Sequence, residues 1–263
     1  MERRQLKRVI ILILVTLNAF LGLYLLRQRV PERAAAYRAK QNLLELYAAD
    51  GVSLPPEIVP RGGPPPVIRL SLDADTMDRA AAFFLGPGFD FSQQGGVRQY
   101  RAPDGAELRF HADGSFTATG LSIHADPATL CRDFCRNWPY APPDSIDDGE
   151  AVLTARYGSL SVFNCGVSFY FDGNILQEAF GTLLPQTGTP ADTPELTAWG
   201  ALGIFQAKRR ENRVVSAEIR RVSLRYALQG ADGDDLSLVP VWRIETDTAA
   251  YHINCVTGGM IFS

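Results

Sequence analysis

The longest apolar stretch of the chain lies close to its N-terminus. Residues 9–26 read VIILILVTLNAFLGLYLL and carry no charged side chain. A helix of this length rises about 1.5 Å per residue and reaches about 27 Å, close to the thickness of the hydrocarbon core of a bilayer. The pattern therefore predicts a transmembrane helix over residues 9–26, preceded by a basic head of residues 1–8.

A cleaved signal peptide is the alternative interpretation of this segment. Its apolar core would span about 7–15 residues and would be followed promptly by small residues. Here Arg27 and Arg29 follow at once, and the alanines at 34–36 come only after them. We therefore favour an uncleaved anchor. Because a short basic head before a first apolar helix usually stays in the cytoplasm, we expect a single-pass protein of the cell membrane, with a cytoplasmic N-terminus and an extracytoplasmic C-terminal domain.

Asn18 is the most polar side chain inside the apolar segment. One interpretation is that its amide hydrogen-bonds to a backbone carbonyl of its own helix. The other is that it hydrogen-bonds to a second helix, which contributes about 1 kcal/mol in lipid. Together with Thr16, Leu17 and Leu21, Asn18 is the candidate partner-binding site of the sequence.

Residues 27–66 form the predicted juxtamembrane region. Apolar positions at helical spacing predict a helix over residues 32–49, which Asp50 and Gly51 end. The following stretch, VSLPPEIVPRGGPPPV, holds six of the 17 prolines. This composition indicates an extended and fairly stiff connector.

From residue 67 onward, helical and strand patterns alternate. The predicted helices cover residues 75–85, begin at Asp126 with Pro127 in first position, and run from Thr193 to Arg210. Strand patterns precede and follow them, at 97–101, 107–111, 115–119, 151–157, 160–171, 175–184 and 214–228. The last of these strands changes phase at Arg220 and Arg221, which predicts a bulge. Pro240 predicts an edge position or a second bulge in the next strand.

These elements predict an α+β fold with antiparallel sheets and helices packed on one face. The recurrence of a helix followed by strands predicts repeated helix-plus-antiparallel-sheet units behind the transmembrane helix. The expected regions are a first α+β region of residues 67–190 and a C-terminal unit of residues 191–263. The spacing between copies is loose, at about 50–65 residues.

Composition narrows the possible functions. The 263 residues carry a net charge of −3. The four basic residues and one acidic residue that precede Arg27 hide a larger excess, since 22 basic and 28 acidic residues remain after them, about −6. Nucleic-acid-binding proteins are usually basic, so we expect no nucleic-acid partner.

No motif of known chemistry stands out. The chain has no GxSxG elbow, phosphate loop, HExxH or CxxC. His111 and His252 alternate with apolar strand residues and are expected to face solvent, and His124 lies far from both. The acidic pairs at 73/75, 147/148 and 234/235 are typical of solvated turns. We therefore predict a protein that is not an enzyme, with no catalytic residue, cofactor, metal site or small-molecule substrate.

The four cysteines are too few for a disulfide scaffold. Cys131 and Cys135 share one face of a predicted helix, which does not give good bridge geometry. Cys165 and Cys255 lie on predicted strands. The default interpretation is small buried apolar side chains, and a disulfide from a helical to a strand cysteine is the alternative outside the cell.

The two ends of the chain resemble a known family. The segment RVIILILVTLNAFLGLYLL, the following ELYAADGVSLPPEIVP and the tail LVPVWRIETDTAAYHINCVTGGMIF are similar to the corresponding parts of YycI-type proteins. The tail also resembles the PepSY-type unit of exported bacterial proteins. Residues 67–190 carry no matching motif.

The resemblance implies a non-catalytic, membrane-anchored regulator of a sensor histidine kinase in a two-component system that controls cell-wall metabolism. It further implies a sister protein of YycH type, contacted within the membrane and outside it. The alternative is an extracytoplasmic PepSY-like module that inhibits an exported peptidase or binds cell-wall fragments. An anchored enzyme with an unrecognised site is a third hypothesis.

Overall fold

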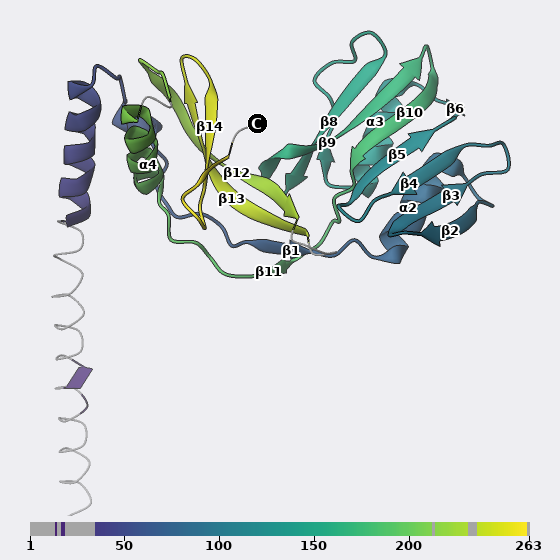
Figure 1. Cartoon of the computed structure of the whole chain (residues 1–263), viewed down its shortest axis with the longest axis horizontal. Coiled ribbons are helices and arrows are strands. Elements are labelled where there is room, and N and C mark those ends of the chain that lie inside the picture. The colour runs from purple at the N-terminus through teal and green to yellow at the C-terminus, as the bar shows by residue number, and fades with distance from the viewer. Residues whose placement is uncertain (1–13, 15–16, 19–34, 212–213, 231–235, 262–263) are drawn as a thin grey trace, which may run out of the picture. The chain divides into compact units, whose positions relative to one another are not determined.

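The computed structural model describes residues 14, 17–18, 35–211, 214–230 and 236–261 (Figure 1). The chain divides into two compact units, Met1–Pro56 and Glu57–Ser263. In the first unit, residues 35–49 are helical and end at Asp50 and Gly51, as predicted. The backbone N–H of Asp50 donates to the carbonyl of Leu46 at 3.1 Å, which closes the last turn.

Helices of the described residues are all too short or too polar to cross a membrane. The predicted transmembrane segment at 9–26 lies outside the described residues, apart from Leu14, Leu17 and Asn18, which are helical.

In the second unit, one group of antiparallel strands follows the order β8-β9-β10-β5-β4-β3-β2. The short strands β6 and β7 pair with β10 and β8 respectively. The bounds are β2 (Asp90–Gln94), β3 (Val97–Arg101), β4 (Glu107–Phe110), β5 (Ser115–Thr119), β6 (Ile123–His124), β7 (Tyr140–Ala141), β8 (Glu150–Tyr157), β9 (Leu160–Asp172) and β10 (Ile175–Thr182). The predicted strands at 97–101 and 115–119 match these bounds, and those at 151–157 and 160–171 match within one residue.

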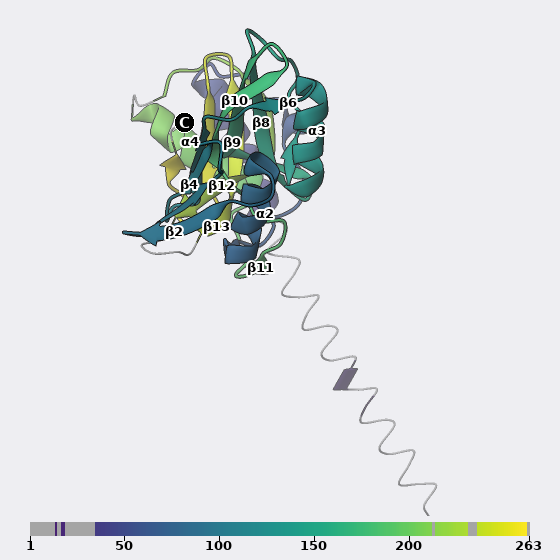
Figure 2. The same ribbon diagram turned by 90° about the vertical axis from the view of Figure 1, so that its right-hand side faces the viewer.

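Helices α2 (Ala74–Leu85) and α3 (Pro127–Asn137) cover one face of this sheet (Figure 2). Each begins where an aspartate side chain accepts a backbone N–H of the first turn: Asp73 caps α2, and Asp126 caps α3 as predicted. Gly86 ends α2 with a φ of 73°, a conformation that favours glycine.

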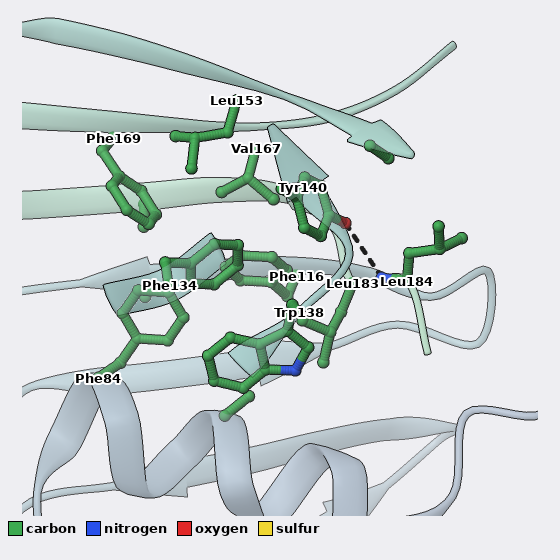
Figure 3. Packing of buried hydrophobic residues seen from close by; sticks show 14 of the residues in the cluster. Phe84, Phe116, Phe134, Trp138, Tyr140, Leu153, Val167, Phe169, Leu183 and Leu184 are labelled. Atoms are coloured by element: carbon green, nitrogen blue, oxygen red, sulfur yellow. Dashed lines mark hydrogen bonds between the residues drawn. The ribbon is translucent and has the colours of Figure 1, made fainter. Parts of the chain in front are cut away.

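The core between the helices and this sheet contains a group of packed aromatic rings among aliphatic side chains (Figure 3). Phe134 of α3 stacks on Trp138 with ring centroids 4.6 Å apart and meets Phe169 of β9 edge-on at 5.2 Å. Phe84 of α2 reaches the same ring of Phe169 at 6.0 Å. Such ring pairs stabilise the packing beyond the apolar area that they bury, so α2 and α3 are fixed rigidly against the sheet.

The remaining strands form the C-terminal part of the second unit. Their bounds are β1 (Ile68–Leu70), β11 (Thr189–Pro190), β12 (Ile219–Gly230), β13 (Leu236–Thr246), β14 (Ala250–Asn254) and β15 (Met260–Ile261), with the short 3-10 helix η1 (Pro56–Ile58) before β1. Helix α4 (Ala198–Arg210) packs on β13 and β14. The side chain of Thr197 caps it, so the predicted start at Thr193 is wrong by about one turn.

The structure contradicts the predicted fold class. The strands do not fall into consecutive helix-plus-antiparallel-sheet units, because the hydrogen-bonded path runs β11-β1-β13-β12-β9-β10-β5-β4-β3-β2. The 13-residue strand β9 pairs with β10 at one end and lies parallel to β12 at the other, where Val162 faces Tyr226. The result is a mixed, sheet-rich fold. The recurrence of helices along the sequence suggested repeats, but each helix packs on different strands: α2 on β4, α3 on β7 and β8, and α4 on β13 and β14.

Two predictions about backbone irregularities had different outcomes. The bulge at Arg220 and Arg221 is confirmed, since the register of β12 against β13 shifts between Ile219 and Arg221. Pro240 is neither at an edge nor in a bulge, because it pairs opposite Tyr226 inside β13. Its carbonyl accepts the N–H of Cys255, so its nitrogen points to the same side of β13, at the interruption between the pairing with β1 and the pairing with β14. A missing N–H costs no ladder bond there.

Candidate functional site

The face of the β8-β9-β10 sheet opposite to α2 and α3 carries exposed apolar side chains. Val152 and Phe180 are 54% and 43% exposed. Both align with Ser168 of β9, so they lie in one row across three strands. Tyr170 stacks on Phe180 with ring centroids 5.4 Å apart. We call Val152, Tyr170 and Phe180 the aromatic face. Aromatic and aliphatic side chains exposed together on a rigid sheet are typical of an interaction surface.

Carboxylates flank the aromatic face. Glu150 and Glu178 stand on either side of Tyr170 in the register of the three strands. The Tyr170 hydroxyl donates to Oε1 of Glu150 at 2.7 Å, and this bond raises the pKa of Tyr170. The bond fixes the ring in place, and the two carboxylates make the rim of the face negative.

A hollow of about 350 Å³ continues the face at the start of β8, lined by Asp144, Ser145, Asp147, Glu150, Val152 and Thr154. The turn before β8 is held by paired bonds between the backbones of Asp147 and Glu150, at 2.8 and 3.1 Å. A side chain at Gly149 would place its Cβ 2.4 Å from the carbonyl oxygen of Phe171, so only glycine fits this turn. The carboxylates of the hollow are therefore presented by a tightly packed turn.

The outer edge of β8 is partly open. Among the described residues, the strand β7 covers it only at Thr154 and Ala155. Asp147 occupies the same edge at Glu150 through the two backbone bonds described above, so the opening is short and leaves the backbone groups of Val152 available to a strand of another chain. Val152, on the aromatic face, lies along this edge.

The residues that the sequence singled out as partner-binding lie elsewhere. Leu17 and Asn18 are helical, and Leu17 is exposed, whereas Thr16 and Leu21 lie outside the described residues. The amide nitrogen of Asn18 donates to the carbonyl oxygen of Leu14 at 3.0 Å. This bond agrees with the first interpretation of Asn18, a hydrogen bond to a backbone carbonyl of its own helix. It uses one amide hydrogen, and the amide oxygen takes no part in it.

The four cysteines are free thiols. Cys165 and Cys255 are buried, as the default interpretation predicted. Cys131 is buried too, and Cys135 is half-buried. Burial raises the pKa of Cys131, Cys135 and Cys165 to about 11 and that of Cys255 to about 12. Thiols of this kind are poor nucleophiles at neutral pH.

The histidines divide into two kinds. His111 and His124 are exposed, as expected for His111. The expectation that His252 faces solvent is wrong, because it is only 4% exposed. Burial and the nearby Arg243 and Arg225 lower the pKa of His252 to about 4. In the described part of the chain, no group of three or more histidine, cysteine or acidic side chains is arranged to hold a metal ion.

The aromatic face was missed at the sequence level because its residues lie within continuous apolar runs. Tyr170 stands between Phe169 and Phe171, both of which point into the core. A bulge between Leu176 and Glu178 turns Phe180 outward. Alternation over residues 165–171 of β9 separates the two faces, but the outward position of Phe180 required knowledge of the bulge in β10.

Comparison with known proteins adds little. No protein-family model matches the chain, and no curated protein matches it either. A crystal structure of an uncharacterized protein from Eubacterium rectale is similar over 77% of this chain and 86% of that chain, with 9% identity and a TM-score of 0.42. A similarity of this size carries no argument about function.

Proposed function

We propose that this protein is a non-catalytic regulator, held at the cell membrane by its apolar segment 9–26, that acts by binding other proteins. The supporting observation is the aromatic face, which exposes Val152 and Phe180 on a rigid sheet beside a partly open strand edge. Burying such side chains against a partner contributes about 25 cal/mol per Å² of apolar surface. The acidic rim selects for a partner segment that carries positive charge.

The sequence resemblance supplies the class of partner. A YycI-type protein regulates a sensor histidine kinase together with a sister protein of YycH type. In this proposal the basic head stays in the cytoplasm, the residues around Asn18 contact partner spans, and the second unit binds the extracytoplasmic part of the partner. A basic strand that pairs with β8 and covers Val152 and Phe180 fits the observed surface.

The test uses the full chain with charge introduced into the aromatic face. Val152→Glu and Phe180→Glu add negative charge at exposed positions, so the fold should persist. Val215→Glu is the matched control, because Val215 is 77% exposed and lies outside the aromatic face. We expect co-purification of the kinase from membranes to fall at least tenfold in the first two variants and to persist in the control.

Unchanged co-purification in both face variants would refute the docking surface. A full chain that fractionates with soluble proteins would refute the membrane location. Replacing Asn18 by Leu tests the contact within the membrane separately, since a contact through its amide oxygen would be lost.

A groove in the C-terminal part favours the second candidate, a module that binds cell-wall fragments. It has a volume of about 470 Å³ and lies where β1 and β14 meet the edge of β13. In the strand order, β12 and β9 separate the groove at β13 from the edge of β8. Soluble peptidoglycan fragments that perturb groove residues and leave the kinase complex intact would support this candidate over the first.

A further inference from the structure

Three arginines gather on one face of the C-terminal sheet. In the register of β12, β13 and β14, Arg221 faces Glu245, Arg243 lies between Ser223 and His252, and Arg225 faces Val241. Alternation places these residues on the same side of the sheet, and Arg243 is diagonal to both other arginines. We call Arg221, Arg225 and Arg243 the arginine cluster.

The arginine cluster carries more positive charge than the neighbouring acidic side chain neutralises. Arg243 forms an ion pair with Glu245, with 2.6 Å between Nη1 and Oε2. Among the described residues, neither Arg221 nor Arg225 has a hydrogen-bond acceptor or an ion-pair partner. Burial and the charges of Arg243 and Arg221 lower the pKa of Arg225. Three positive charges and one negative charge leave a local charge of +2, which destabilises the free protein.

An aromatic pair lies beside the cluster. The rings of Phe163 from β9 and His252 from β14 stack with centroids 3.8 Å apart and an angle of 5° between their planes. Because β12 and β13 separate these two strands, the sheet curls enough to bring side chains of β9 and β14 into contact on the side of the arginine cluster. His252 is buried, and neither of its ring nitrogens has a hydrogen-bond partner among the described residues.

A buried imidazole without hydrogen-bond partners is unfavourable, since its ring nitrogens lose their hydrogen bonds to water and gain none within the protein. A bound anion would relieve both the excess positive charge and the missing hydrogen bonds of His252, because it neutralises the arginines and accepts a hydrogen bond from an imidazole N–H. Guanidinium groups bind phosphate and carboxylate through paired hydrogen bonds. A phosphate monoester dianion matches the local charge of +2, whereas a carboxylate leaves +1.

The groove next to the cluster offers room for the rest of such a ligand. It shares the face of the arginine cluster, since Gln229, Ser237 and Val239 follow the same alternation as Arg225 and Val241. Asn254 lines the groove and stands in one row with Val241 and Arg225. The groove wall carries Arg69 together with the acidic Asp192 and Glu195, so the positive charge that would attract an anion comes from the arginine cluster and not from the groove.

We propose that the arginine cluster and His252 bind a phosphate group, carried by a small phosphorylated molecule or by a lipid headgroup. This inference goes beyond the proposed function and uses a surface other than the aromatic face. Arg225 and Arg221 hold the oxygens, Arg243 adds charge while it remains paired with Glu245, and His252 senses the anion. The charges of Arg243 and Arg225 act on His252, whereas Glu245 is paired with Arg243 and acts on Arg225.

The experiment follows the histidine signals of the full chain by NMR in neutral nanodiscs. The chain has three histidines, so the exposed His111 and His124 serve as internal controls. Inorganic phosphate should shift the His252 signals and raise its pKa from about 4 toward its ordinary value, because a bound anion favours the charged imidazole. Sodium chloride of equal ionic strength should leave all three signals in place.

Variants and lipids complete the test. Arg225→Gln and Arg221→Gln should each weaken the phosphate response at least tenfold, whereas Arg132→Gln, an exposed position on α3, should not. Nanodiscs that contain phosphatidic acid should shift His252 without added phosphate if a headgroup is the ligand, and glycerol phosphate alone should do so otherwise. The proposal is overturned if phosphate leaves His252 unmoved, if acetate shifts it equally, or if both arginine variants respond as the wild type does.

Discussion

At the scale of single residues, Tyr140 links the core to the segment that leaves the β10 strand. Its hydroxyl donates to the carbonyl of Thr182. It also accepts the backbone N–H of Leu184 at 3.0 Å, a bond drawn in Figure 3. Complete burial raises the pKa of Tyr140 well above its ordinary value. The hydroxyl thus satisfies two backbone groups that lie more than 40 residues away along the chain.

Tyr140→Phe should destabilise the second unit by about 1–3 kcal/mol, because it leaves the buried N–H of Leu184 without an acceptor. Urea unfolding followed by tryptophan fluorescence measures the change. Tyr37→Phe, at a 64% exposed position, is the control and should leave the midpoint unchanged. Equal midpoints for the wild type and the Tyr140 variant would show that the bond contributes nothing.

Burial of single residues also determines how readily the four cysteine thiols react. With pKa values of about 11 to 12, only about one thiol in a thousand or fewer is ionised at pH 8. A thiol reagent should therefore react with the native protein over hours and with all four cysteines within minutes in urea. A cysteine that reacts rapidly in the native protein would contradict this burial, and mass spectrometry would identify it.

At the scale of elements, local sequence signals predicted one helix start and one bulge correctly but failed at two other positions. Asp126 and Pro127 fixed the start of α3, and the change of phase at Arg220 located the bulge of β12. The start of α4 was missed, because Thr193 and Thr197 both resemble caps and only packing selects between them. The position of Pro240 was missed because two different strands share one edge of β13, which no local pattern reveals.

The cap of α2 makes a pH-dependent contribution. The Thr76 N–H donates to the Asp73 carboxylate at 2.8 Å, and hydrogen bonds from Thr76 lower the pKa of Asp73. The stabilisation is therefore present above the ordinary pKa of 3.8 and is lost as the pH falls through the folded value. Asp73→Ala should cost about 1 kcal/mol at pH 7.

Thermal unfolding between pH 2 and pH 7 tests this prediction. The gap between the wild type and the Ala variant should narrow in acid. Asp73→Asn keeps an acceptor and should stay close to the wild type at pH 7. A gap between wild type and Ala variant that is constant with pH would show that the carboxylate charge plays no part in the cap.

The close contact between β9 and β10 depends on a glycine. Gly181 has a φ of 151°, and a Cβ there would lie 2.2 Å from the carbonyl oxygen of Gly166 and 2.7 Å from the Cα of Val167. Gly181→Ala should therefore destabilise the sheet by at least about 1–3 kcal/mol. Gly173→Ala, at a turn with open space, should cost less, since only its φ of 56° opposes the side chain. Denaturant midpoints that rank the two variants in the opposite order would refute the contact.

At the scale of the whole molecule, the chain's regions are interleaved rather than consecutive. The strand β1, from before the first helix of the second unit, pairs with β13 near the C-terminus, and β9 pairs with β12. Leu236 and Leu238 belong to the same core cluster as Phe84 and Phe134. Local periodicity does not reveal contacts between residues so distant in sequence. Only the recurrence of a helix followed by strands is visible in the sequence, and that recurrence suggested repeats.

This interleaving predicts that residues 57–263 unfold as one cooperative unit and that residues 191–263 do not fold alone. Isolated, the C-terminal segment would expose Leu236, Leu238 and Tyr226 and would lose both β1 and β9 as strand partners. Circular dichroism and urea unfolding of the two fragments measure this, with an equimolar mixture of 67–190 and 191–263 as a further sample. We expect a single transition for 57–263, a non-cooperative change for 191–263, and recovered structure in the mixture if the pieces associate. A sharp, reversible transition of 191–263 by itself would mean that β12, β13, β14 and α4 carry enough buried apolar surface to fold without the rest, and that the long-range strand pairs serve to dock two stable halves.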